Sequence, residues 1–207
     1  MARMARMDDR SPSAPLPGVP FPGSPRFIAA VDAAVSSGDE HAVTAALRTT
    51  LCTLIRDPDI HLPDCVYAPI EGHYARRELY RSAEHGYSIV AMTWGPGQGT
   101  PLHDHCGLWC VEGVWHGELE ITQYELLTSE GDRCRFRPAN GMQAMTGSAG
   151  SLIPPHEYHT IGNTSRDQVA VSVHVYQAPI EHCCKFEPEG DDWYVRTDAR
   201  LSVDVPA

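Results

Sequence analysis

The 207-residue sequence has no long hydrophobic run and no excess of basic residues. No apolar stretch approaches the roughly 18 residues that a membrane-spanning helix needs. Arg3 and Arg6 are not followed by the apolar segment of a secretory signal. Lys and Arg number 16 against 27 Asp and Glu, so the formal net charge is −11. This charge excludes a general electrostatic surface for nucleic acid or anionic membrane. We expect a cytoplasmic protein that binds neither and needs a local cation to hold an anionic ligand.

The cysteines lack the patterns of a disulfide scaffold or a structural zinc site. There are seven, an odd number, and no CxxC pair occurs among them. Without a secretory signal, we expect the thiols to stay reduced. Four cysteines carry no chemistry that the sequence assigns and are expected to be small buried apolar residues: Cys106, Cys134, Cys183 and Cys184.

The N-terminal segment differs in composition from the rest of the chain. Residues 1–26 are rich in proline with interleaved Gly and Ser, so they offer too little apolar surface to offset the ordering of the backbone. We predict a flexible tail over residues 1–26 and a single domain over residues 27–207, a size that suits one hydrophobic core.

Hydrophobic periodicity predicts helices first and strands afterwards. Apolar residues recur at helical spacing through residues 27–56, with an interruption at 36–38, which predicts two helices ending near Asp57-Pro58. Beyond about residue 86, short segments separated by turn residues predict strands: 87–94, 108–115, 118–126, 149–153 and 169–176. This order predicts a mainly β fold, an antiparallel barrel or sandwich, with N-terminal helices.

A His-x-His pair is the most informative short motif. On a strand, His103 and His105 point to one face and Asp104 to the other, so one short segment supplies two imidazoles to a metal. The pair alone is a weak signal, because core and surface histidines are commoner than ligands.

The surroundings of the pair resemble the first motif of the cupin superfamily, small antiparallel β-barrels that hold a metal inside. Gly97 lies six residues before His103, and Gly117 lies twelve residues after His105, where the motif has a glycine that turns the chain. The motif's glutamate, five residues after the second histidine, is replaced by Cys110. The resemblance therefore implies a metal-binding barrel without the usual carboxylate ligand.

A second segment, PPHEYHTIGN, resembles the second cupin motif and offers a third ligand. Pro154 lies five residues before His159, and Asn163 lies four residues after it. His156 competes for the role, but a strand would turn it to the opposite face. We therefore expect His159 to join the pair.

Three neutral imidazoles leave a divalent ion with its full positive charge and with open coordination positions. Such a centre favours anionic ligands, and a thiol that coordinates it loses its proton. A thiolate and dioxygen could then occupy neighbouring positions, as in a thiol dioxygenase. Zinc held by three histidines, for hydrolysis or hydration, is the competing interpretation.

The segment VAVSVHVY at residues 169–176 has two distinct faces. Ser172, His174 and Tyr176 project from one side of the predicted strand, and three valines project from the other. If the polar face looks into the barrel, its side chains can pass hydrogen bonds along a chain and place a phenol near the metal. The alternative is an edge strand with a solvated polar face.

Together these motifs resemble the type I cysteine dioxygenase family. The resemblance rests on HDH, on a cysteine five residues after the second histidine, and on SVHVY thirteen residues beyond the third histidine. It extends from Tyr74 to about Phe186. It implies a cupin-type enzyme of cysteine catabolism that oxidises L-cysteine with O2 to cysteine sulfinate, with Fe(2+) bound by three histidines: His103, His105 and His159.

The same resemblance implies roles for the remaining motif residues. In Tyr74-Ala75-Arg76, the family's Tyr-x-Arg, Arg76 would hold the substrate carboxylate with help from Tyr74. Cys110 falls where mammalian members have the cysteine that forms a thioether bond with the active-site tyrosine, here Tyr176. The hydrogen-bonded triad behind the metal would be Ser172, His174 and Tyr176.

The sequence leaves two questions open: the substrate, and the positions of Arg77 and Lys185. WGPGQGTPLHDH also resembles the bacterial 3-mercaptopropionate dioxygenases, which characteristically carry Gln at the position of Arg76. A small thiol acid other than cysteine is therefore an alternative, and a non-catalytic cupin that binds a metal or small ligand is another. Adjacent arginines such as Arg76 and Arg77 are ordinarily a solvated pair, of which one would here become the ligand clamp. Lys185 is expected at the surface, with a second cation near the pocket as the alternative. We expect the partners to be a small thiol and dioxygen, and the chain to be a monomer or a weak homo-oligomer.

Overall fold

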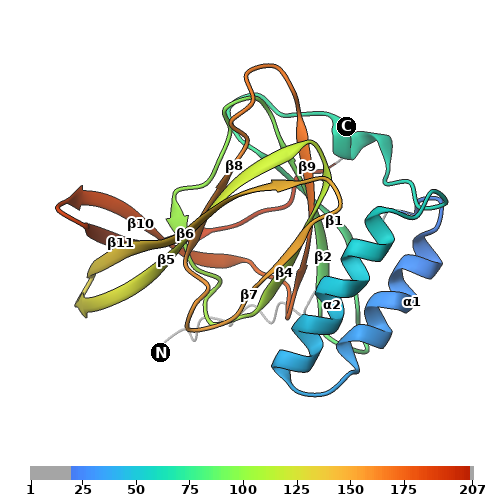
Figure 1. Ribbon diagram of the computed structural model, residues 1–207, viewed down its shortest axis with the longest axis horizontal. Coiled ribbons are helices and arrows are strands. Elements are labelled where there is room, and N and C mark those ends of the chain that lie inside the picture. Colours follow the sequence, from blue (N-terminus) through green and yellow to red (C-terminus); the bar gives the residue numbers. More distant parts are fainter. Residues whose placement is uncertain (1–19, 206–207) are drawn as a thin grey trace, which may run out of the picture.

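The structure is a computed structural model that describes residues 20–205, and it contains two N-terminal helices on one side of a β-barrel (Figure 1). Helix α1 spans Ser24–Val35, α2 spans Glu40–Ile55, and a short 3-10 helix, η1, covers Asp64–Tyr67. The two predicted helices, their interruption and their end are confirmed.

The N-terminal boundary lies earlier than the composition suggested. Residues 1–19 of the predicted tail lie outside the described residues, but residues 20–26 belong to the folded part. Phe21 is buried and packs edge-on against Phe27, with ring centroids 5.9 Å apart. Pro25 occupies the first turn of α1, where its missing N–H removes no hydrogen bond. A proline-rich stretch can therefore begin a helix.

The described residues contain eleven strands. They are β1 Ala75–Arg81, β2 Ser88–Trp94, β3 Leu102–His103, β4 Cys110–His116, β5 Glu118–Glu130, β6 Arg133–Met145, β7 Ala149–Leu152, β8 His159–Gly162, β9 Ala170–Tyr176, β10 His182–Gly190 and β11 Trp193–Arg200. The five predicted strands correspond to β2, β4, β5, β7 and β9. The two histidine motifs, which were also treated as strands, contain β3 and β8. The prediction missed the other four, which include the long C-terminal hairpin of β10 and β11.

The strands form two antiparallel sheets. One sheet has the order β1-β2-β9-β4-β7, and the other six strands close into a ring in the order β10-β11-β6-β5-β8-β3. The β5–β6 and β10–β11 hairpins extend away from the helices (Figure 1). The predicted mainly β fold, a cupin-type antiparallel barrel with N-terminal helices, is confirmed.

Strand β9 lies at the middle of the five-stranded sheet and is buried on both faces. Val171, Val173 and Val175 join the core under α1 and α2. Helix α2 approaches β4 so closely that a Cβ on Gly113 would lie 2.8 Å from Ile55 Cδ1. Because side chains alternate along a strand, the polar residues of β9 face away from the helices into the barrel.

Gly117 connects β4 to β5 as its motif position predicted. Its φ of 74° lies in the left-handed region, and an added Cβ would lie 2.9 Å from the Val169 carbonyl oxygen. Glycine is the residue that both constraints favour. Among residues 20–205, no helix is long and apolar enough to cross a membrane.

Candidate metal centre

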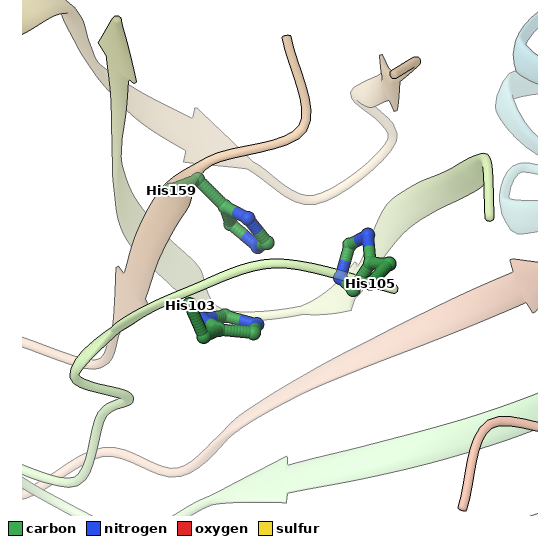
Figure 2. A group of neighbouring side chains, drawn as sticks. All are labelled: His103, His105 and His159. Carbon is green, nitrogen blue, oxygen red and sulfur yellow. The ribbon is translucent and has the colours of Figure 1, made fainter. Parts of the chain in front are cut away.

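Three histidines from two segments of the chain meet inside the barrel, and His105 comes from the loop after β3 rather than from the expected strand (Figure 2). His103 at the end of β3 pairs directly with His159 at the start of β8, and their ring centroids are 4.3 Å apart. His105 lies two residues beyond His103, and its ring is 5.1 Å from that of His159. One ring nitrogen from each lies within 4.8 Å of the others. His156, the competing residue, is exposed in the preceding turn.

The surroundings of these imidazoles fit them as metal ligands. His103 Nδ1 lies 3.1 Å from the Pro101 carbonyl oxygen, and His159 Nδ1 lies 2.9 Å from the Glu157 carbonyl oxygen. A carbonyl can only accept, so each Nδ1 carries the proton and leaves Nε2 free to bind a metal. The Nδ1 of His105 is buried without a hydrogen-bond partner.

Burial also keeps the three rings neutral. It lowers the pKa of His103 to about 4 and holds the pKa values of His105 and His159 well below the usual range, helped by the neighbouring histidines. Neutral imidazole is the form that binds a transition metal. The donor set therefore fits a divalent ion with three nitrogen ligands.

The histidines line a narrow cavity whose empty space, its mouth included, is about 440 Å³. Strand β10 forms part of the wall because Lys185 pairs with His103 across the β3–β10 ladder. Lys185 and Cys183 therefore line the cavity, so Lys185 takes the alternative position near the pocket rather than the expected one at the surface. The reason is that β10 was not predicted, so its inward face was unknown. The cavity is completed by apolar residues that sequence reasoning did not single out: Met92, Ile161, Ile180 and Leu201.

Arg76 brings an unpaired positive charge to this cavity. It is 5% exposed, and its Nε and Nη1 have no hydrogen-bond partner. The neighbouring Arg77 instead donates to Thr93 Oγ1 at 2.8 Å and to the Ala68 carbonyl oxygen at 2.9 Å, so it is buried rather than at the surface. A buried guanidinium needs an anionic or polar partner. The cavity is therefore built to receive a small anion at Arg76.

Tyr74 forms another wall of the cavity. Its ring stacks on Trp94 with centroids 4.6 Å apart, and burial raises the pKa of its hydroxyl. The phenol is therefore neutral at physiological pH and can donate a hydrogen bond.

The polar face of β9 carries a buried hydrogen-bond chain. Trp94 Nε1 donates to Ser172 Oγ at 2.9 Å, and Ser172 Oγ lies 2.8 Å from His174 Nε2. Because the indole N–H only donates, the hydroxyl proton of Ser172 can go to His174 Nε2. Burial, followed by the charge of Arg76, lowers the pKa of His174 to about 3, so the neutral ring carries its proton on Nδ1.

The predicted hydrogen-bond chain does not continue from the His174 nitrogen to the Tyr176 hydroxyl. Its Nδ1 lies 3.8 Å from Cys110 Sγ and 3.4 Å from Glu112 Oε2. The ring of Tyr176 stacks on that of His174, with centroids 5.8 Å apart and an interplanar angle of 16°. The expected Ser–His link is present, but the imidazole nitrogen is directed at β4 rather than at the phenol.

Cys110 and Tyr176 lie side by side because they are directly paired in the β4–β9 ladder. Both are buried, and burial raises the pKa of each well above its usual range. The neighbouring phenol of Tyr176 partly opposes this shift in the pKa of the Cys110 thiol. The two groups are therefore protonated neighbours in contact.

Glu112 is a buried acid that sequence reasoning missed. It lies two residues after Cys110 on the same face of β4 and pairs with His174 across the ladder. Burial raises its pKa to about 7. The strict alternation of side chains along β4 was the signal that could have identified it.

Comparison with known proteins places these residues in a family. The family model for cysteine dioxygenase type I matches residues 65–189. Cysteine dioxygenase type 1 from Bos taurus is 24% identical over 127 residues, which cover 59% of this chain and 60% of that protein. The Danio rerio protein of the same name is 22% identical over 121 residues, with 58% and 60% covered. The chain thus spans less than two thirds of the length of these curated relatives.

A solved structure also resembles this chain, at a lower sequence identity than these two relatives. A conserved protein with a double-stranded β-helix domain from Klebsiella pneumoniae is 20% identical, with 60% of this chain and 87% of that chain covered at a TM-score of 0.44.

The match of the family model spans more than half of the chain, and it includes the three histidines, Arg76 and the polar face of β9. This chain belongs to the type I cysteine dioxygenase family.

Proposed function

We propose that this chain is an iron-dependent thiol dioxygenase that adds both atoms of dioxygen to the sulfur of L-cysteine and releases cysteine sulfinate. The observation that supports this most directly is the buried, unpartnered Arg76 guanidinium in the cavity of three neutral imidazoles. L-Cysteine carries a thiolate for the metal and a carboxylate for the guanidinium. A cavity with both recognition elements suits a small thiol acid.

The three histidines His103, His105 and His159 would hold Fe(2+). When bound, the iron supplies the electron-transfer chemistry that lets dioxygen react with a thiolate. All three protein ligands are neutral, so they favour an anionic thiolate over a neutral thiol at the remaining positions.

Other residues would bind and orient the substrate. Arg76 would grip the carboxylate through two parallel hydrogen bonds, and Tyr74 would assist from its position on Trp94. Tyr176, which lies 5.5 Å from His105 between ring centroids, would donate its hydroxyl proton to the carboxylate or to the reacting oxygen. The apolar side chains of the wall would exclude water and so strengthen these charged contacts.

The test is oxygen uptake by the iron-loaded full chain with a panel of small thiols: L-cysteine, 3-mercaptopropionate and cysteamine. We expect the highest kcat/KM with L-cysteine, and a product heavier than the thiol by two oxygen atoms in mass spectrometry. Uptake that prefers 3-mercaptopropionate would overturn the assigned substrate but keep the reaction. No thiol-dependent uptake with iron bound would overturn the reaction itself.

A further inference from the structure

A second cluster of metal-binding groups lies behind the three histidines, on the opposite face of the same segment. Asp104 points away from the cavity because it stands between His103 and His105 on the chain. Its carboxylate and the thiols of Cys106 and Cys184 each place one ligand atom within 4.8 Å of the others. Asp104 is 9% exposed and Cys106 is exposed, so the cluster can be reached from solvent.

The backbone holds the two thiols in place through Asp104. Asp104 Oδ1 accepts the N–H of Cys184 at 2.8 Å and the N–H of Cys106 at 3.2 Å. Cys106 has a φ of 53°, a left-handed conformation that is uncommon for a residue other than glycine. The hydrogen bond from the Cys106 N–H to Asp104 Oδ1 stabilises this turn, which brings Cys106 back over Cys184.

A second carboxylate lies beside the cluster. Asp198 on β11 pairs directly with Cys184 on β10, and Cys184 Sγ lies 3.7 Å from Asp198 Oδ1. Strand alternation separates this group from the cavity, because Cys183 and Lys185 point inward and Cys184 points outward. Two sulfurs and two carboxylates thus gather at one outer point of the barrel.

We propose that Asp104, Cys106 and Cys184, with Asp198 as the fourth ligand, form a second metal site for a divalent cation of the zinc type. Zinc prefers four tetrahedral ligands drawn from thiolates, imidazoles and carboxylates, at about 2.3 Å for sulfur and about 2.0 to 2.2 Å for oxygen. The ligand atoms of Asp104, Cys106 and Cys184 lie within 4.8 Å of one another, and Asp198 Oδ1 lies 3.7 Å from Cys184 Sγ, so small side-chain shifts would reach these distances. On binding, each thiol loses its proton to solvent as its metal–sulfur bond forms. The site is distinct from the three-histidine centre but shares its chain segment.

The experiment is a titration of the reduced, metal-free full chain with Co²⁺, which substitutes for zinc. A near-ultraviolet sulfur-to-cobalt charge-transfer band reports thiolate ligands, which the three-histidine centre does not supply. We expect a saturable band and one more equivalent of bound cobalt than the three histidines account for. Cys106→Ser and Cys184→Ser should each remove the band.

Matched variants separate this site from other thiols. Cys183→Ser tests a thiol that lines the three-histidine cavity, Cys110→Ser tests the buried thiol beside Tyr176, and Cys52→Ser on α2 tests a distant one. All three should keep the band. Asp104→Asn keeps an oxygen that can accept the two backbone N–H groups but removes the charge, so it should weaken cobalt binding at least tenfold with little change in the melting temperature.

Several outcomes would overturn the proposal. One is a band that survives the loss of both Cys106 and Cys184, or that disappears in Cys110→Ser. A band that needs Cys106 but not Cys184 would show adventitious binding at one exposed thiol. Loss of two free thiols without any cobalt band would show that the pair forms a disulfide instead.

Discussion

At the scale of single residues, Arg76 and Arg77 show how neighbours of the same type receive different environments. Both are buried on β1, and alternation turns them to opposite faces. Arg77 donates to Thr93 and to a backbone carbonyl, and its unpartnered Nε lies outside the cavity, whereas Nε and Nη1 of Arg76 have no partner and Arg76 lines the cavity. Only Arg76 is therefore available to a ligand.

We predict that Arg76→Ala lowers kcat/KM for L-cysteine by roughly thirtyfold to a thousandfold, the effect of about 2 to 4 kcal/mol of charged contact in a dry cavity. The value for cysteamine, which has no carboxylate, should change far less. Arg76→Lys should recover little of the lost kcat/KM, because a lysine ammonium cannot form the two parallel hydrogen bonds of the planar guanidinium. Arg81→Ala on the same strand, whose native partner is Glu78, is the control. Equal losses with both thiols would contradict the role.

Glu112 predicts a dependence of stability on pH. Its folded pKa of about 7 lies above the ordinary 4.5, so between these values the folded state binds more protons than the unfolded state. The free energy of unfolding should therefore fall as pH rises through this window. Glu112→Gln removes the ionisable group facing His174 and should make the protein more stable than wild type at pH 8, by at most about 3 kcal/mol.

Urea unfolding at pH 5 and pH 8 measures this difference. Glu118→Gln, which changes an exposed carboxylate on β5, should leave the pH dependence as in wild type. If the free energy of unfolding of Glu112→Gln changed between pH 5 and pH 8 as much as that of the wild type, the burial of Glu112 would not be the cause of the wild-type pH dependence.

At the scale of elements, β9 separates the two halves of the molecule. Its valines pack against the helices, and its polar residues face the barrel interior. The β4–β9 register determines which groups meet across it, because a slip by one residue would turn every side chain to the other face. This register brings Cys110 to Tyr176 and Glu112 to His174.

The pairing predicts a thioether between Cys110 and Tyr176 after turnover with iron and dioxygen. Formation of the carbon–sulfur bond removes two hydrogens, which dioxygen accepts. The intact chain should become lighter by two hydrogens, and tryptic digestion should yield a fused peptide pair. Cys110→Ser is the control that cannot form it. Separate recovery of both peptides after prolonged turnover would count against the bond.

At the scale of the whole molecule, closure of the barrel assembles the metal centre. Strand β3 lies between β8 and β10, so the His-x-His segment meets His159 on one side and Lys185 on the other. Strand β1 of the opposite sheet contributes Arg76. A metal held by these segments ties the two halves of the chain together.

We predict that metal removal lowers the melting temperature. A ligand that binds only the folded state stabilises it by about 2.7 kcal/mol at a hundredfold excess over its Kd. Calorimetry with and without added Fe(2+) should show the shift in the wild type, and His159→Ala should abolish it. His156→Ala, three residues earlier and exposed, should retain the shift. A shift that persisted in His159→Ala with Cys106→Ser, which also disables the second site, would exclude that histidine as a ligand.

The sequence by itself determined the local features of this protein. Motif spacing predicted that His103, His105 and His159 come together, and hydrophobic periodicity predicted the two faces of β9 and the helix break at residues 36–38. These features depend on periods of two or 3.6 residues, which a short window of sequence contains.

Tertiary structure decided which distant groups meet. The separate environments of Arg76 and Arg77, the inward position of Lys185 and the contact of Glu112 with His174 all follow from strand pairing. The cluster of Asp104, Cys106 and Cys184 joins segments almost eighty residues apart, which only the β3–β10 pairing brings together. Register between strands depends on long-range packing, and a local pattern does not contain that information.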